Sequence, residues 1–224
     1  MDTAKKILFA GDPHGDFKPL IKAVYNQKPA AVVLLGDCDL VSPLEHCLQE
    51  ILNLTEIYWI AGNHDFESPE KYRYLFHSGL AQNNLHLTVK NIGGLRIAGL
   101  GGIFLGRVWY PPQMPKWPSK QAFLASGRGF SQDSVLSLKY QSAIWPDEFE
   151  FLKGMEADIL VSHEAPGSHC FGFKAIGELA AAMKVKTIFH GHLHEDYACI
   201  MPNQVRVFGV ANGGVRDLAG ECCL

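Results

Sequence analysis

The sequence contains no hydrophobic run long enough to cross a membrane. Its purely apolar segments are short, well below the ~18 residues that a transmembrane helix requires. At the start of the chain, MDTAKKILFA, only four apolar residues follow the lysines, which is fewer than the core of a signal peptide needs. These absences predict a cytoplasmic protein with no membrane association.

Internal repeats, low-complexity segments and CxxC pairs are also absent. The cysteines follow no regular spacing (Cys38, Cys47, Cys170, Cys199, Cys222, Cys223), so we expect reduced thiols and no disulfide framework. The 224 residues are 47% hydrophobic and 19% charged, with a net charge of −3. Length and composition suit a single globular domain over residues 1–224.

Short apolar segments rich in β-branched residues recur along the chain, and each one ends in a polar cluster. They span residues 6–10, 30–35, 56–61, 157–162 and 186–190. Helical patterns at 17–27 and 43–53 separate the first three, which predicts buried, largely parallel strands in βαβ units. Segments 85–100, with a turn at Gly93–Gly94, and 197–211 favour hairpins. The pattern predicts an α/β fold in which two mixed β-sheets pack together, flanked by helices.

Residues 105–145 fit neither pattern, because four prolines and many aromatic residues interrupt any regular period. A long irregular insertion inside a compact domain is usually a lid or a binding loop. A surface excursion with no role in function is the alternative.

This irregular segment overlaps a span, from Lys71 to Gln132, that contains no aspartate or glutamate. Basic and aromatic side chains there could grip an organic phosphate through charge and cation–π contacts. Together with Asn63, the predicted substrate-binding residues are Arg107, Trp109, Lys116, Lys120 and Arg128. The alternative is a face of solvated lysines with aromatic rings that pack the loop down.

Each buried strand ends in residues suited to metal chemistry. The clusters are GDPHGD (11–16), GDCD (36–39), GNHD (62–65), SHEAPG (162–167) and HGHLH (190–194). Ligands of open α/β sheets bind at the carboxyl ends of the strands, so we expect these clusters to meet in space. A single GD after a strand is common turn chemistry, but a whole series of strand-terminal clusters is hard to explain as turns.

The candidate ligands supply oxygen and imidazole nitrogen and no thiolate: Asp12, His14, Asp37, Asn63, His163, His192 and His194. This set exceeds the coordination number of a structural zinc site. Mixed carboxylate, amide and imidazole ligands suit manganese or iron, with zinc as a further candidate in vitro. With one carboxylate shared, the set fits two ions ~3.5–4 Å apart, an arrangement used for phosphoryl hydrolysis.

In order and spacing, the series GDPHG, GDCD, GNHD, SHEAPG and GHLH resembles the calcineurin-like metallophosphoesterase superfamily over residues 11–194. The resemblance implies a four-layer αββα sandwich. It also implies the distribution of ligands: Asp12, His14 and His194 on one metal, Asn63, His163 and His192 on the other, and Asp37 bridging both. His64 matches the catalytic histidine of the family, and Asp65 matches the acid that orients it.

The sequence departs from the family members that act on phosphoserine and phosphothreonine proteins. Those carry an arginine after the second motif and another after the third, where this chain reads GDCDLVS and GNHDFES. The departure argues against a protein phosphatase and favours the compact phosphodiesterase-like members. The net charge of −3 and the lack of an extra DNA-binding domain argue against a nucleic-acid substrate.

These observations predict a dinuclear metal-dependent hydrolase of small organic phosphate esters, more suited to diesters than to monoesters. Two cations lower the pKa of a shared water, and the resulting hydroxide attacks phosphorus. His64 protonates the departing oxygen as general acid. The alternatives are a phosphomonoesterase or nucleotide phosphatase, and a non-catalytic metal-binding scaffold.

Overall fold

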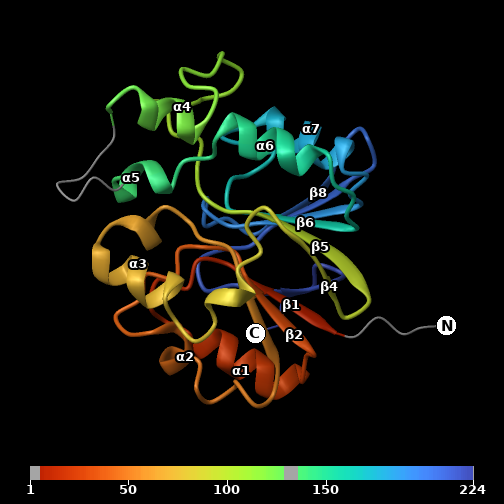
Figure 1. Cartoon of the computed structure of the whole chain (residues 1–224). Coiled ribbons are helices and arrows are strands. Elements are labelled where there is room, and N and C mark those ends of the chain that lie inside the picture. Colours follow the sequence, from red (N-terminus) through yellow and green to blue (C-terminus); the bar gives the residue numbers. More distant parts are fainter. Residues whose placement is uncertain (1–5, 129–135, 224) are drawn as a thin grey trace.

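The computed structural model describes residues 6–128 and 136–223 (Figure 1). Residues 1–5 at the start of the chain, residues 129–135 of the irregular segment and Leu224 lie outside this description. The helices are α1 Lys18–Gln27, α2 Leu44–Cys47, α3 Pro69–Phe76, α4 Lys120–Ala125, α5 Leu138–Gln141, α6 Pro146–Lys153 and α7 Lys174–Ala182, with 3-10 turns η1 His64–Phe66 and η2 Ala81–Asn83. None of these described helices is both long and apolar enough to span a bilayer.

The strands form two mixed sheets. In chain order they are β1 Ile7–Ala10, β2 Ala31–Leu34, β3 Glu56–Trp59, β4 Val89–Ile92, β5 Leu95–Leu100, β6 Ile159–Ser162, β7 Thr187–His190, β8 Tyr197–Ile200, β9 Arg206–Gly209 and β10 Val215–Asp217. The first sheet has the order β10–β1–β2–β3 and the second β4–β5–β6–β7–β9–β8. The inner pairs are parallel, whereas β10, β4 and β8 run antiparallel to their neighbours. Both predicted hairpins are therefore confirmed.

Side chains that alternate along β1 pack into two different hydrophobic cores. Leu8 and Ala10 pack in the core that the first sheet shares with α1 and α2, whereas Ile7 and Phe9 pack between the two sheets. Phe9 stacks on Phe189 of β7, with their ring centroids 3.7 Å apart. A third core joins the other face of the second sheet to α6 and α7. The result is the predicted four-layer arrangement, with helices outside two packed sheets (Figure 1).

One predicted helix is shorter than expected. The pattern over 43–53 gives only α2, and residues 48–54 continue as turns. The Ile51 and Leu54 amides donate to carbonyls three residues earlier, which is tighter than an α-helix. These turns keep Leu48 and Ile51 buried against the first sheet, so tertiary packing outweighs the local helical preference.

The described part of the 105–145 segment contains α4, α5 and a small hydrophobic core of its own. Its buried members are Val108, Phe123, Leu136 and Ala143, together with Trp145 at the start of α6. This core is the reason for the many aromatic residues in the segment. The helices α4 and α5 lie beside α6, and α5 contacts η1 (Figure 1).

Candidate metal centre

The donor atoms of the predicted ligands converge in two groups that share Asp37. One group contains Asp12, His14, Asp37 and His194, the other contains Asp37, His163 and His192, and within each the donor atoms lie within 4.8 Å of one another. His14 Nε2 lies 3.1 Å from His194 Nε2. His163 Nε2 lies 3.1 Å from His192 Nδ1 and 3.3 Å from Asn63 Oδ1. The structure therefore brings all the predicted ligands together.

The backbone at these ligands is strained. Positive φ angles occur at Asp12 (37°), His14 (42°), Asp37 (47°), His192 (70°) and His194 (56°). Residues with a side chain rarely adopt this region, and each instance costs about 1–3 kcal/mol unless the surrounding structure over-determines it. Strain at the ends of β1, β2 and β7 accompanies the convergence of the donor atoms, which is typical of a functional site.

Two glycines leave the space that the ligands occupy. A Cβ atom on Gly62 would lie 2.2 Å from Asp37 Oδ1 and 2.4 Å from His163 Cε1. A Cβ atom on Gly191 would lie 2.5 Å from Asp12 Oδ2. Any side chain at either position would push a ligand out of its group. The glycines of the third and fifth motifs are therefore steric requirements of the site.

The electrostatics of the cluster favour cations. Burial raises the pKa of Asp12 to about 7, against the opposing effect of His163. Burial also disfavours ionised Asp37, but the charge and hydrogen bond of His163 outweigh it and lower the Asp37 pKa. Burial in turn disfavours the His163 imidazolium, yet Asp37 raises the His163 pKa to about 10. The same field attracts metal cations, whose binding releases protons from ligands, so the donor set fits two metal ions.

The 3-10 turn η1 places His64 beside the ligands. The His64 and His14 ring centroids lie 5.0 Å apart, and the His64 amide donates to Asp37 Oδ1 over 2.8 Å. The His64 ring Nδ1 lies 2.7 Å from Glu67 Oε1. Residues three apart share a face of a 3-10 turn, so Glu67 lies next to the imidazole. The structure therefore pairs His64 with Glu67, whereas the sequence predicted Asp65.

Asp65 points to the opposite side of η1 and is buried. Its Oδ1 accepts the amides of Cys38 and Asp39 at 2.9 and 3.2 Å, and its Oδ2 accepts the Gly62 amide at 2.8 Å. Burial, with the nearby charge of Asp37, raises the Asp65 pKa to about 6. Asp65 thus joins the turns of the second and third motifs, and its contacts do not include the His64 ring.

A chain of charged side chains links His64 back to the ligand His14. Glu67 Oε2 lies 2.6 Å from Lys71 Nζ, and Lys71 also pairs with Asp39. Asp39 Oδ2 lies 3.8 Å from His14 Nδ1. Sequence reasoning missed Glu67 and Lys71. Their spacing of three and four residues, from His64 to Glu67 and from Glu67 to Lys71, was the available signal.

Two further side chains support the His192 loop. Glu164 Oε1 accepts the Phe104 amide at 2.8 Å, and its Oε2 lies 3.9 Å from His192 Nε2, on the opposite side of the ring from His163. His190 donates from Nδ1 to the Gly191 carbonyl at 2.9 Å, and its Nε2 accepts the Tyr197 hydroxyl at 2.6 Å. Carboxylates and carbonyls in such positions orient metal-binding histidines and their loops.

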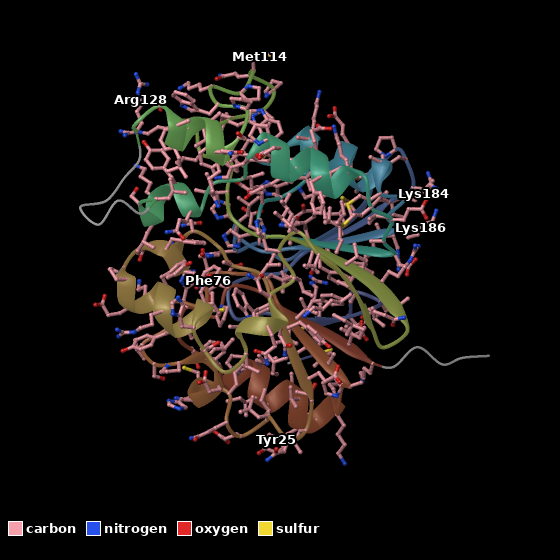
Figure 2. The ribbon with its side chains drawn as sticks, viewed as in Figure 1. Tyr25, Phe76, Met114, Arg128, Lys184 and Lys186 are labelled. Carbon is pink, nitrogen blue, oxygen red and sulfur yellow. The ribbon has the colours of Figure 1, made fainter. Side chains whose placement is uncertain are left out.

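Within the described residues, no hydrogen bond or ion pair joins the metal-ligand side chains to Arg107, Trp109, Lys116, Lys120 or Arg128. Lys116 Nζ donates to the Gly106 carbonyl over 2.7 Å. The Arg128 guanidinium lies over the Trp117 ring at the outer edge of the molecule (Figure 2). Lys120 differs from these because it lines a cavity. The role of these residues in substrate binding stays a prediction.

Comparison with known proteins agrees with this geometry. The chain matches the family model for calcineurin-like phosphoesterases over residues 5–196. An uncharacterised protein of Haemophilus influenzae is 36% identical over 220 residues, which cover 97% of this chain and 96% of that one. The chain therefore belongs to the calcineurin-like phosphoesterase family. It is a metal-dependent phosphoester hydrolase, as predicted from its motifs.

Solved structures share the fold at low sequence identity. A dimetal phosphatase from Danio rerio superposes with a TM-score of 0.58 at 12% identity, covering 95% of this chain and 92% of that one. The phosphopantetheinyl hydrolase of Mycobacterium tuberculosis gives a TM-score of 0.57 at 15% identity, covering 94% and 91%. At these identities the likeness shows a common fold.

Proposed function

We propose that the protein hydrolyses diesters of phosphate with small organic groups at a dinuclear metal centre. The observation that carries the proposal is the pair of ligand groups joined by Asp37. Asp12, His14 and His194 would hold one ion, and Asn63, His163 and His192 the other. When bound, two such ions supply a nucleophilic water near neutral pH and neutralise charge on the phosphoryl oxygens.

The donor chemistry favours manganese or iron. The ligands are carboxylate, amide and imidazole groups, which suit these metals better than a soft ion. The only sulfur in the second motif belongs to Cys38, between Asp37 and Asp39. Burial and the surrounding carboxylates raise the pKa of the Cys38 thiol, so it stays protonated and is a poor ligand.

We assign His64 as the general acid that protonates the departing oxygen. Its Nδ1 faces Glu67 at 2.7 Å, which leaves Nε2 for the leaving group. The carboxylate of Glu67 holds a proton on Nδ1 and fixes the ring beside His14. Lys71 in turn keeps Glu67 in place.

The preference for diesters follows from charge. A phosphate monoester carries nearly two negative charges near pH 7, whereas a diester carries one. Among the described residues, no hydrogen bond or ion pair joins an arginine to the ligand side chains. Contacts elsewhere are made by Arg73 over Tyr74, Arg96 with Asp158, Arg128 over Trp117, Arg206 with Thr187, and Arg216 with Asp196. The extra charge of a monoester therefore finds no arginine paired into this cluster, and a diester suits the site better.

Metal analysis followed by a substrate screen tests this function. Protein purified without chelator should carry about two transition-metal ions per chain, and chelation should abolish activity that manganese restores. At equal concentration, bis-p-nitrophenyl phosphate should be hydrolysed faster than p-nitrophenyl phosphate. Full activity without metal would contradict the dinuclear site, and a faster monoester reaction would contradict the diester preference. An Asp147→Asn variant, changed at the start of α6, is the matched control and should keep both ions.

A further inference from the structure

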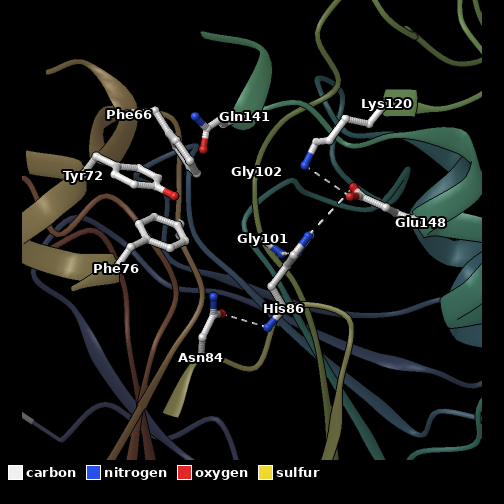
Figure 3. Close-up of a pocket in the computed structure, with 11 residues that line it drawn as sticks. Phe66, Tyr72, Phe76, Asn84, His86, Gly101, Gly102, Lys120, Gln141 and Glu148 are labelled. Atoms are coloured by element: carbon white, nitrogen blue, oxygen red, sulfur yellow. Dashed lines mark hydrogen bonds and ion pairs between the residues drawn. The ribbon is translucent and has the colours of Figure 1, made fainter. Parts of the chain in front are cut away.

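A second polar cluster, formed by His86, Lys120 and Glu148, lines a cavity next to η1. The cavity has a volume of about 170 Å³ and lies between α3, η1 and helices α4 to α6, with the backbone of Gly101 and Gly102 at its base (Figure 3). None of the predicted metal ligands lines it. Its two walls differ in chemistry, and neither wall has a role in the metal centre.

One wall is aromatic. Tyr72 and Phe76 of α3 stack with ring centroids 4.4 Å apart, and Phe66 of η1 lies 5.2 Å from Phe76. These rings stand together on one side of the cavity (Figure 3). Such a wall offers a flat, apolar surface on which a planar ligand ring can stack.

The opposite wall is polar and centres on Glu148 of α6. Glu148 Oε1 lies 3.6 Å from Lys120 Nζ, and its Oε2 lies 3.9 Å from His86 Nε2 (Figure 3). Both distances exceed those of ordinary hydrogen bonds, which are about 2.7–3.2 Å. The carboxylate therefore retains capacity to accept hydrogen bonds from a ligand.

The contacts of His86 in this wall determine which of its ring nitrogens carries the proton. The Gly101 amide donates to His86 Nδ1 over 3.1 Å, so a neutral ring carries its proton on Nε2, the atom that faces Glu148. Burial and the nearby Lys120 charge lower the His86 pKa to about 4. The wall thus combines an acceptor at Glu148 with donors at Lys120 and His86.

We infer that this cavity binds a planar nitrogen heterocycle of the nucleobase type, as part of the substrate of the metal centre. The ring would stack on the aromatic wall, with its N–H groups donating to Glu148 and its acceptors receiving hydrogen bonds from Lys120. A cavity of about 150 Å³ holds one benzene ring, so the size suits a single ring such as a pyrimidine. This inference rests on the proposed phosphoesterase function.

The position of the cavity relates it to the proposed general acid. Two of its lining residues, Ala61 and Phe66, flank the Asn63–His64 turn in sequence. The Ala61 carbonyl accepts the Gly102 amide at 2.8 Å, which ties this turn to the base of the cavity. We therefore assign the nucleoside as the leaving group, on the side that His64 protonates.

Direct binding tests the inference without turnover. Calorimetry on the metal-loaded full chain should show uridine binding at one site. It should show no binding of ribose, which lacks the pyrimidine base. Lys120→Met and Glu148→Leu should each weaken uridine binding about tenfold or more. Lys153→Met and Glu150→Leu are matched controls, because this ion pair (2.7 Å) lies on the same helix α6 outside the cavity. They should leave binding unchanged.

Absence of binding by uridine, cytidine and adenosine at millimolar concentration would overturn the inference. So would equal weakening by the cavity variants and their controls. Lys120 is partly exposed at the cavity edge, so its variant keeps the test available even if Glu148→Leu folds poorly.

Steady-state kinetics then connects the cavity to the metal centre. Lys120→Met should raise KM about tenfold for the methyl diester of uridine 5′-phosphate, with kcat nearly unchanged. The matching methyl diester of ribose 5-phosphate should show no change. Equal effects on both esters would overturn the assignment as a base site. A protein that binds uridine yet hydrolyses no ester would contradict the proposed function and leave the cavity assignment supported.

Discussion

The metal-ligand cluster and the cavity cluster of His86, Lys120 and Glu148 are built in different ways. In the metal-ligand cluster every member lies within four residues of the end of a strand, and several pairs of donor atoms lie 3.1–3.4 Å apart. In the cavity cluster, His86, Lys120 and Glu148 come from three separate segments and lie 3.6–3.9 Å apart. The first cluster has a strained backbone with positive φ angles, which His86, Lys120 and Glu148 lack.

This difference indicates how strongly the members of each cluster depend on one another. The ligand cluster contains the buried carboxylate of Asp37 and the buried imidazole of His163, and the pKa of each depends on the other, so removing one group changes its partner as well. The cavity cluster is partly exposed, with longer contacts, and its members are weakly coupled. We therefore expect large, non-additive effects at the first cluster and smaller effects at the second.

The largest effect is expected from Asp37→Asn. Asp37 belongs to both ligand groups, so loss of its charge weakens attraction for both ions, whereas Asp12 belongs to one. Asp37→Asn should reduce activity by roughly a thousandfold or more and lower the affinity for both ions. Asp12→Asn should weaken mainly one ion. Metal titrations of the two variants decide between these outcomes, and two tight ions retained in Asp37→Asn would refute the bridging assignment.

His64→Ala should follow, with an effect that depends on the leaving group. A general acid contributes roughly a hundredfold to ten-thousandfold, but only where the departing oxygen is too basic to leave unaided. The variant should therefore keep much of its activity on a nitrophenyl diester and lose most of it on an alkyl or ribose ester. Rates on both esters at matched metal content provide the measurement.

The control for this variant is its metal content, which should stay near that of the wild type because His64 is absent from both ligand groups. Equal slowing on both esters with metal retained would assign His64 to stabilising phosphoryl charge. Loss of metal would show that it is a ligand.

The sequence could predict the ligand cluster because its information is local. Each ligand follows a buried apolar strand, and parallel strands deliver their carboxyl ends to one edge. The layers follow from the burial of both faces of these strands, as Ile7 and Leu8 show by packing on opposite faces of one strand. Composition and periodicity therefore sufficed for the sheets, the hairpins and the converging motifs.

The sequence could not predict contacts that depend on three-dimensional turns or on distant segments. Asp65 follows His64 directly, but the 3-10 turn directs the two side chains apart and brings Glu67 to the imidazole. His86, Lys120 and Glu148 carry no motif, and they lie far apart in the sequence, so only the folded chain brings them to one cavity. Strand-end motifs specify the metal centre, whereas the fold as a whole specifies the cavity.

Glu67→Gln should have a moderate effect, because it keeps the length of the side chain and removes its charge. Removal of a supporting partner typically costs about tenfold to a hundredfold, so we expect about tenfold on an alkyl ester with metal content unchanged. Glu70→Gln, on the exposed surface of the first turn of α3, is the matched control and should have no effect.

Asp65→Asn tests whether Glu67 or Asp65 orients the His64 ring. It replaces an acceptor of three backbone amides with a side chain that also donates, so it should lower the free energy of unfolding by about 1–3 kcal/mol. Urea unfolding provides the measurement. If Asp65→Asn left stability intact and removed only the leaving-group dependence, Asp65 rather than Glu67 would orient His64.

The smallest effect is expected from His86→Gln. It tests the pH dependence of the cavity cluster, where the histidine pKa shifts in the opposite direction to that of His163 in the ligand cluster. The carboxylates raise the His163 pKa to about 10, whereas burial lowers the His86 pKa to about 4 from 6.5. As pH falls below 6.5 the unfolded chain takes up a proton at His86 while the folded protein does not, so stability is lost between pH 6.5 and about 4. The side chain is 29% exposed, so we expect a loss of about 1–2 kcal/mol in the free energy of unfolding, less than the full pKa shift would give.

Glutamine can still accept the Gly101 amide but does not titrate. Urea unfolding at pH 7.5 and 4.5 should therefore show the wild type losing about 1–2 kcal/mol more than the variant. Equal losses of unfolding free energy in the two proteins would mean that the His86 ring is already solvated in the folded protein. His86 would then not be the neutral hydrogen-bond donor in the cavity wall that the geometry indicates.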